Sequence, residues 1–382
     1  MVSISGDPFI YWTLKTILLI ILFVCGYLIS FRDKDGSKYW LYGIPAIVAY
    51  SLEYGLRWNR SFDYPHYYQD LTGTLFQEYS DPIYLLWIDI VKLFSIDPIA
   101  VFVFYSAILV YAFMLVLKER RELAFLALPL FMIIPAQADN HIRQYFAFAF
   151  IMLGYYFDFK NRKTKAYLLY IIGLGIHMSG FFCVAFIQFF KYVKLDKIIK
   201  SPWWIICLYL LLYFVWDSSK LEGFADWLSK YVNMGDNSMR GYIDNAEYWF
   251  TDESDINDKI GVKSVSSKLY FDVINLTIQC GIMYYGYKLI KKDDFLVIPY
   301  WTIVWCYFNR VIGGNNEIFS RFSSWVDVFN PFIVSAIILT YKFKTNIKIL
   351  SIILFCYFYI YVGHIQRMWH INLTGYEYVW DK

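Results

Sequence analysis

The sequence predicts an all-α integral membrane protein that crosses the bilayer about twelve times, each span needing about 20 apolar residues. Hydrophobic residues make up 59% of the 382 residues and charged residues 18%, whereas soluble domains carry about 25% charged residues. Long apolar runs recur along the whole chain, and basic residues collect in the short segments between them. Lipid must therefore be the solvent for most of the surface. We expect one transmembrane domain, residues 1–382.

Apolar runs of near-spanning length define the predicted helices. The first follows MVSISGDPF, which lacks the positive start of a signal peptide, and it is too long to be a signal core. We therefore expect it to be retained as a span. The predicted spans lie near residues 9–31, 39–56, 98–117, 122–137, 144–159, 202–216, 269–290, 295–312, 322–341 and 349–366.

The loops rich in Lys and Arg set the predicted orientation, because such loops stay on the cytoplasmic side. They are FRDKDGSK, KERR, KNRKTK, KYVKLDKIIK, KLIKK and YKFKTNIK. The intervening segments and both termini are then external. The external segments include residues 57–97, which carry an amphipathic helix, and the long polar loop 217–268.

Two segments do not read as simple spans. A single helix over 166–190 would place one basic loop outside, so the glycines and serine around His177 predict two short helices with His177 near an external turn. A single tilted span is the alternative. Residues 81–96 are amphipathic, with Asp89 and Lys92 interrupting the apolar pattern, and indicate an interfacial or re-entrant helix.

Arg143 is the first candidate site residue. It lies in the stretch DNHIRQYF, where Asp139, Asn140 and Gln144 share a helix start with it. A charge at membrane depth faces a cavity or a partner more often than lipid. The alternative is an interfacial Asp139–Arg143 pair that only anchors the turn.

Two further arginines are predicted on the same side of the membrane as Arg143. Arg310 lies at the end of the predicted span 295–312, and Arg321 lies at the start of the predicted span 322–341. Guanidinium groups present a planar fork that matches phosphate oxygens, so the three arginines could surround one anion. The alternative for each arginine is that it only caps a helix end or extends its charged group to the membrane surface.

Two other groups of residues could contact a sugar. The stretch RWNRSFDYPHYYQDL holds Arg60, Asp63, Tyr64 and Tyr67, a mixture of rings and charges that suits sugar binding, although tyrosines also form aromatic belts at membrane surfaces. His177 titrates near neutrality and could take a proton from an attacking hydroxyl. A hydrogen-bonded core histidine is the alternative, but the flanking glycines let another group come close.

Several motifs are absent from the sequence. There is no Walker loop, GxGxxG, HExxH or GxSxG, and the six cysteines form no CxxC pair. The net charge of +3 is too small to indicate nucleic-acid binding. We therefore expect no zinc site and no nucleotide cofactor, and a substrate that arrives already activated through the membrane.

Three stretches then occur in the order and spacing of one family: FDYPHYYQDL, SDPIYLLWIDIVKLFSID, and NHIRQYFAFAF continuing through the basic loop to GIHMSGFF. The chain resembles the EpsG-like branch of the Wzy-type polysaccharide polymerases, closely over residues 60–190 and loosely over 300–340. That family shows an Asp-Tyr pair, then a Glu-Pro-Gly that opens an amphipathic stretch. An Asn-x-Ile-Arg-Gln helix start follows, and later a helix that ends in histidine. Here Asp81 precedes the proline, and the 217–268 loop has no counterpart.

The resemblance implies a GT-C-like, metal-independent glycosyltransferase with an all-helical fold. Such a polymerase transfers an undecaprenyl-pyrophosphate-linked glycan, with inversion, onto a lipid-linked repeat unit at the periplasmic face of the bacterial inner membrane. It implies membrane lipid, a flippase and a chain-length regulator as partners. Arg143, Arg321 and Arg310 would hold the pyrophosphate, and His177 or Asp63 would deprotonate the acceptor. The remaining substrate contacts would come from Asn140, Gln144, Tyr64, Tyr67 and Arg60.

Other functions are compatible with parts of this pattern. An O-antigen-ligase-like transferase would use nearly the same site chemistry. A lipid-linked sugar transporter or flippase would show inverted repeats and broken helices near the midplane, whereas the polar residues here gather at one face without a repeat. A structural partner of a polysaccharide assembly complex would tolerate the loss of any single arginine.

Overall fold

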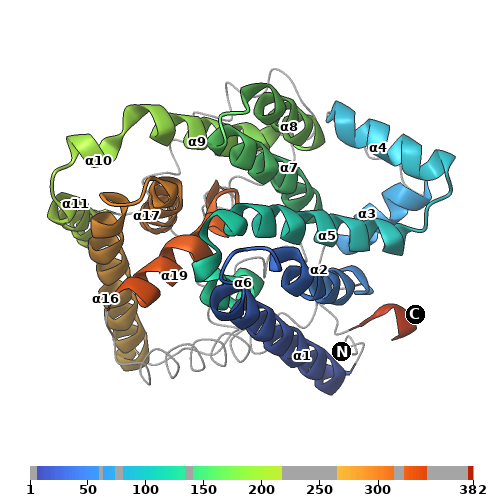
Figure 1. Ribbon diagram of the computed structural model, residues 1–382, viewed down its shortest axis with the longest axis horizontal. Helices are drawn as coiled ribbons and strands as arrows, with labels where there is room; N and C mark the ends of the chain where they lie inside the picture. The colour runs from blue at the N-terminus through green and yellow to red at the C-terminus, as the bar shows by residue number, and fades with distance from the viewer. Residues whose placement is uncertain are drawn as a thin grey trace. The chain divides into compact units, whose positions relative to one another are not determined.

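The computed structural model describes residues 7–59, 63–73, 81–133, 141–216, 265–313, 322–341 and 377–381 (Figure 1). Within these ranges all regular elements are helices, as the sequence predicts. Contacts between residues divide the chain into two compact units. The first comprises Met1–Gln77, Asp81–Ile187 and Ile338–Lys382, and the second Glu78–Ser80 and Gln188–Ile337. Each unit is described by itself.

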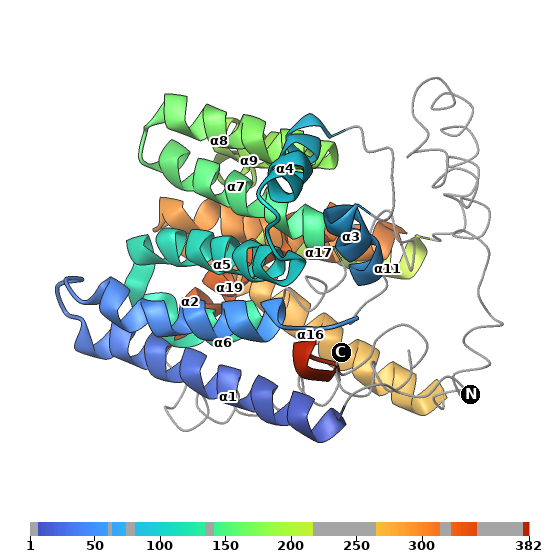
Figure 2. The same ribbon diagram turned by 90° about the vertical axis from the view of Figure 1, so that its right-hand side faces the viewer.

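A row of helices forms the first unit. Helix α1 packs on α2 and α6, α2 packs on α5, α5 on α7, and α7 on α8 (Figure 2). The large aromatic residues Tyr39, Tyr50 and Phe113 are fully enclosed in this row. The helices are α1 (Pro8–Tyr27), α2 (Tyr39–Gly55), α5 (Pro98–Leu117), α6 (Ala124–Ile133), α7 (Ile142–Phe159) and α8 (Lys163–Ile176).

Local sequence explains where two of these helices begin. Each starts with Asp-Pro, in which proline suits the first helical position because that position needs no N–H donor. The preceding aspartate accepts a hydrogen bond from its own helix: Asp7 from the N–H of Phe9 at 2.8 Å in α1, and Asp97 from the N–H of Ile99 at 2.7 Å in α5.

Three of the basic loops meet at one end of the row. The Nζ atom of Lys160 lies 2.6 Å from Oε2 of Glu119, and Arg121 donates a hydrogen bond of 2.6 Å to the backbone oxygen of Lys34. These contacts join the loops around 31–38, 118–121 and 160–165. The prediction that these three loops share one side is therefore confirmed.

The other end of the row carries short helices. They are α3 (Tyr64–Thr72) and α4 (Pro82–Leu93), together with the C-terminal turn η8 (Val379–Asp381). α4 buries Tyr84, Ile88 and Val91 and exposes Leu86, Asp89 and Leu93; an interfacial or re-entrant position for this helix stays a prediction. The final residues pair with the end of α2 through the bridge of Arg57 with Tyr378 and the 2.9 Å bond from Val379 N–H to the Leu56 carbonyl.

A break at His177 follows α8. A 3₁₀ turn, η4 (Met178–Gly180), leads from it to α9 (Phe181–Val193). The predicted pair of short helices is therefore present, and a single continuous span over 166–190 is not. In the described contacts α8 packs on α7 and α4 rather than along α9, so the two helices do not form a close antiparallel pair.

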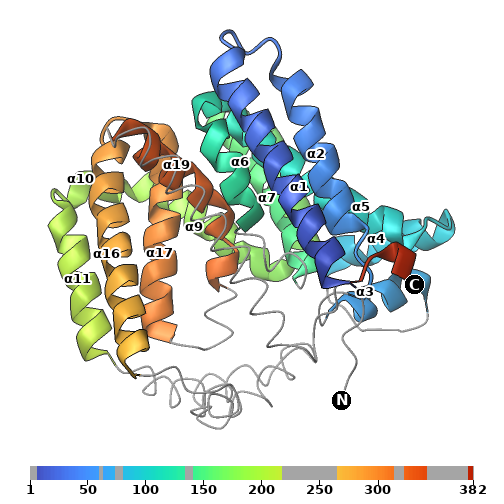
Figure 3. The ribbon, with the colours of Figure 1, turned by 90° about the horizontal axis from the view of Figure 1, so that it is seen from below.

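The second unit contains a group of helices that lie side by side (Figure 3). α11 packs on α16 and α17, and α16 packs on α17. The hydroxyl of Tyr209 in α11 donates to Oε1 of Gln279 in α16 at 2.5 Å, and Asn309 in α17 donates to Ser323 at 2.6 Å. The main helices are α11 (Pro202–Val215), α16 (Val265–Ile290), α17 (Val297–Gly313) and α19 (Asn330–Thr340).

Within the described residues, four helical stretches are long and apolar enough to cross a membrane. They are Phe9–Arg32, Pro98–Met132, Met178–Ile198 and Asp294–Gly313. The chain is therefore a membrane protein, and it is all-helical over the residues that the structure describes. The predicted span 349–366 and the loop 217–268 lie outside the described residues.

Candidate functional site

One buried carboxylate joins three segments of the first unit. Oδ2 of Asp81 lies 2.8 Å from Nη1 of Arg143, and the exposed fractions of the two side chains are 6% and 14%. Oδ1 of Asp81 accepts a hydrogen bond of 2.8 Å from the backbone N–H of Met178, the residue after His177. We call these two contacts the Asp81 bridge. It places Arg143, in the first turn of α7, beside the break that carries His177.

Glycines in α8 allow the segments of the bridge to approach one another. A Cβ atom on Gly175 would lie 2.5 Å from side-chain atoms of Ile83 in α4, and one on Gly173 would lie 3.0 Å from the Ala147 carbonyl in α7. Such distances are too short for a side chain. The glycines around His177 therefore let α4 and α7 pack directly on α8, which brings Asp81 and Arg143 to its end.

Aromatic rings line the same place. The guanidinium carbon of Arg143 lies 5.3 Å from the ring centre of Tyr84, within the range of a cation–π contact. The ring of Tyr67 in α3 meets Tyr84 edge-on, with centres 6.4 Å apart. Tyr67, predicted to bind substrate, is thus connected to Arg143 through one ring.

His177 sits at the end of α8 in an extended conformation, with φ −154° and ψ 106°. Its ring is half-buried, and its Nδ1 atom lies 3.4 Å from the Ser179 hydroxyl. If Ser179 accepts from Nδ1, the Nε2 atom has a lone pair that can accept a proton. The break therefore presents an imidazole rather than burying it within a helix.

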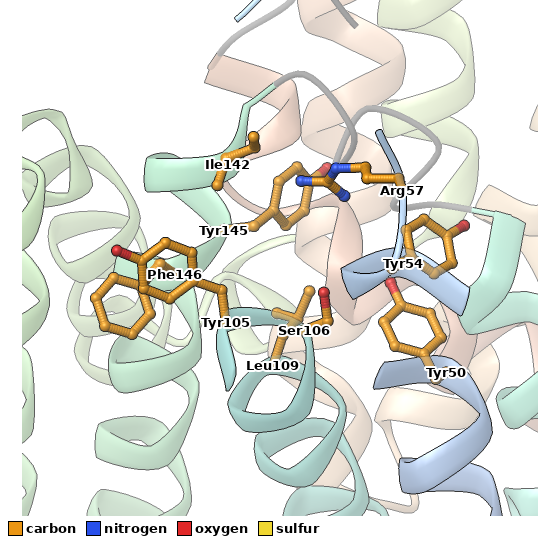
Figure 4. Close-up of a pocket in the computed structure, with 9 residues that line it drawn as sticks. All are labelled: Tyr50, Tyr54, Arg57, Tyr105, Ser106, Leu109, Ile142, Tyr145 and Phe146. Carbon is orange, nitrogen blue, oxygen red and sulfur yellow. The ribbon is translucent and has the colours of Figure 1, made fainter. Parts of the chain in front are cut away.

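A small cavity lies on another face of α7, between α2, α5 and α7 (Figure 4). Its volume of about 20 Å³ has room for about one water molecule. Arg57 reaches over the cavity toward Tyr145. The Arg57 side chain is buried, and its guanidinium lies 5.8 Å from the ring centres of both Tyr64 and Phe102.

The remaining predicted site residues lie in different parts of the chain. Asp63 precedes α3 and is half-buried. Tyr64 is buried, with its ring centre 4.7 Å from that of Phe102, and Gln144 is buried beside Arg143. Arg310 is exposed in the last turn of α17, in the second unit. Arg60, Asn140, Asp139 and Arg321 lie outside the described residues.

In the part of the chain that the structure describes, no group of three or more His, Cys, Asp or Glu side chains converges as a metal site would require. The groups brought together are one guanidinium in contact with one carboxylate, two tyrosine rings beside them, and the backbone of the break that carries His177. A guanidinium can stabilise an anion, and an imidazole can accept a proton.

The fold and site define a helical membrane protein with a buried Asp–Arg ion pair at the end of one helix row. The chain belongs to the EpsG family, whose pattern it matches over residues 39–378. It is therefore a polysaccharide-polymerase-like membrane protein. No curated protein and no solved structure matches the chain.

Sequence reasoning missed the part that Asp81 plays in this site. The sequence showed only that Asp81 precedes Pro82 where the family has glutamate before proline. The sequence also shows that Asp81 is one of three aspartates in an Asp-Pro dipeptide, because the same dipeptide occurs at Asp7 and Asp97, where helices begin. An aspartate of this kind is expected to cap its own helix, and only the folded structure shows that Asp81 does not.

Proposed function

We propose that the protein is a polysaccharide polymerase that joins lipid-linked repeat units. The donor is a glycan on undecaprenyl pyrophosphate, and the acceptor is the sugar end of a second lipid-linked unit. The observation that carries the proposal is the Asp81 bridge, which holds a guanidinium next to the histidine-bearing break in a chain of the EpsG family.

The proposed reaction is a single displacement at the anomeric carbon of the donor. The acceptor hydroxyl attacks this carbon while His177 takes the hydroxyl proton, and the bond from the carbon to the phosphate oxygen breaks. The lipid pyrophosphate leaves with the bonding electrons. Arg143 stabilises the charge that develops on it, as fixed cations do in sites of low dielectric. The configuration at the carbon is inverted.

The proposed topology has about twelve membrane segments, each of about 20 residues where it spans fully, in a GT-C-like architecture. The contact between three basic loops at one end of the row supports it, since basic loops stay in the cytoplasm. The opposite end, with α3, α4 and the Asp81 bridge, would then face the periplasm of a bacterial inner membrane. A lipid-linked diphosphate carries its charge at this headgroup level.

Purified protein incubated with lipid-linked repeat units alone tests the activity. We expect a ladder of products that differ by one repeat unit, separated by gel or mass spectrometry. Transfer of a single glycan onto a different added acceptor, without a ladder, would instead indicate a ligase. The absence of any glycan transfer by folded protein in lipid nanodiscs would refute the proposal.

His177→Gln tests the base. Glutamine keeps a polar group of similar reach but does not titrate, so we expect turnover near neutral pH to fall about 100-fold, within the range for removal of a general base. His66→Gln makes the same substitution at an exposed histidine on α3; it is the matched control and should change turnover far less. Equal activity of the His177 variant and the wild type would assign the acceptor proton to another group, with Asp63 the next candidate.

A further inference from the structure

Asp81 departs from the rule that the other two Asp-Pro helix starts follow. Its backbone angles, φ −90° and ψ 101°, nearly equal those of Asp7, φ −94° and ψ 112°. Asp7 and Asp97 cap their own helices, but the Asp81 side chain makes no capping bond to α4. Because a cap normally stabilises a helix start, the Asp81 contacts to α7 and to the break must replace a favourable local interaction.

The geometry of the bridge shows what Asp81 does instead. Its two oxygens engage different partners, Nη1 of Arg143 and the N–H of Met178. One short side chain thus fixes the guanidinium relative to the residue that follows His177. It also places a negative charge beside Arg143, so that the pair is close to neutral until an anionic substrate arrives.

We propose that Asp81 is a positioning and charge-balancing residue for the lipid-linked diphosphate, an inference that rests on the proposed function. It aims Arg143 at the leaving group. Its carboxylate also weakens the attraction between Arg143 and the diphosphate through like-charge repulsion. The same repulsion acts on the lipid diphosphate product, so it helps this product to leave the site.

The Asp81→Asn variant distinguishes the positioning and charge-balancing role from a purely structural role. The asparagine oxygen can still accept from Met178, so the substitution chiefly removes the charge. We expect undecaprenyl diphosphate to bind about 5- to 10-fold more tightly, because a repelling charge a few ångströms away is lost. We expect kcat to fall about 10- to 100-fold, because Arg143 is no longer aimed and product release slows. A residue with a purely structural role would give weaker binding, not tighter.

Three further variants complete the experiment, which uses full-length protein in nanodiscs. Asp81→Glu restores the charge and should return the diphosphate affinity to the wild-type value, with kcat only partly recovered. Asp89→Asn removes the same charge from an exposed position on α4, and Asp97→Asn alters an aspartate that caps its own helix. Both controls should leave affinity and kcat near those of the wild type.

The outcomes separate the two proposals. Tighter binding with slower turnover in Asp81→Asn, absent from both controls, supports the inference. Weaker binding, or values equal to those of Asp89→Asn, overturns the role of Asp81 while leaving the polymerase intact. If wild-type protein binds undecaprenyl diphosphate no better than the Arg143→Ala variant does, the anion site is refuted, and the proposed function with it. If inorganic pyrophosphate binds as tightly as undecaprenyl diphosphate, the proposal that the ligand is lipid-linked is overturned.

Discussion

Two buried ion pairs in the first unit have the same length and different surroundings. Nζ of Lys15 lies 2.8 Å from Oε2 of Glu53, and Nη1 of Arg143 lies 2.8 Å from Oδ2 of Asp81. The first pair joins α1 to α2 and is enclosed. Lys15 sits 3.7 Å from the ring centre of Tyr54, and the second oxygen of Glu53 accepts the hydroxyl of Tyr378 at 3.1 Å.

The difference teaches that the partners of an ion pair decide its role. The Lys15–Glu53 pair has its second carboxylate oxygen tied to the C-terminal segment, so it holds three parts of the chain together. The Asp81–Arg143 pair has its second carboxylate oxygen tied to a helix break that carries an imidazole. We therefore expect the first pair to govern stability and the second to govern activity.

Breaking the Lys15–Glu53 pair should have the largest effect. Lys15→Met fills a similar volume but leaves Glu53 buried without its cation, and removal of one partner of a buried pair destabilises by about 3–5 kcal/mol. We expect a clearly lower temperature of unfolding in detergent, measured by intrinsic tryptophan fluorescence. The protein that remains folded should keep its turnover number.

The double variant Lys15→Met with Glu53→Gln sharpens this test. It removes both charges, and replacement of a whole buried pair by neutral groups is often nearly neutral for stability. Recovery of most of the lost stability would show that the unpaired carboxylate caused the defect. A single variant as stable as the wild type would remove the structural role of this pair.

Removal of Arg143 should have the next largest effect, and on activity instead. Arg143→Ala should lower turnover about 100- to 1000-fold, the range for loss of a group that stabilises a developing anion. Arg143→Lys should recover little, since a point charge lacks the planar fork. Product ladders from equal amounts of folded protein measure this, and Arg162→Ala, an exposed arginine at the basic end of α8, is the control.

A normal ladder from the Arg143→Ala variant would contradict the division of roles between the two pairs. Loss of folded protein in this variant would contradict it as well, because the Asp81–Arg143 pair would then act like the Lys15–Glu53 pair. The comparison therefore rests on measuring yield, unfolding temperature and turnover for each variant together.

The helices themselves could be predicted from sequence because apolar length and Pro or Asp starts are local signals. The helix at 98–117 has the predicted limits, and the break at His177 follows from its glycines. The contact of Arg143 with Asp81 could not be predicted. Asp139, four residues away, was the local candidate and lies outside the described residues. Asp81 reaches Arg143 because Gly175 lets α4 pack on α8. Such a contact depends on tertiary packing between distant segments.

A bulky residue at Gly175 should loosen the Asp81 bridge without touching it. The Cβ atom of Gly175→Val would lie 2.5 Å from the Ile83 side chain, so α4 must shift away from α8. We expect about a 10-fold loss of turnover, because small displacements of a positioning group are costly to catalysis. Ile83→Ala in the same protein should restore part of it. Gly281→Ala, where a Cβ meets nothing within 4 Å, should leave turnover unchanged.

Among these substitutions Tyr378→Phe should have the smallest effect. It tests the contact between the Lys15–Glu53 pair and the C-terminal segment. It removes only the hydroxyl that donates to Oε1 of Glu53, while the ring and the backbone bridge to Arg57 remain. A single hydrogen bond to a charged group contributes about 1.5–3 kcal/mol, and less where water can replace it. We therefore expect a drop in unfolding temperature well below that of Lys15→Met, with full turnover. If turnover falls instead while stability holds, the C-terminal segment acts on the site, and the two ion pairs are coupled rather than separate.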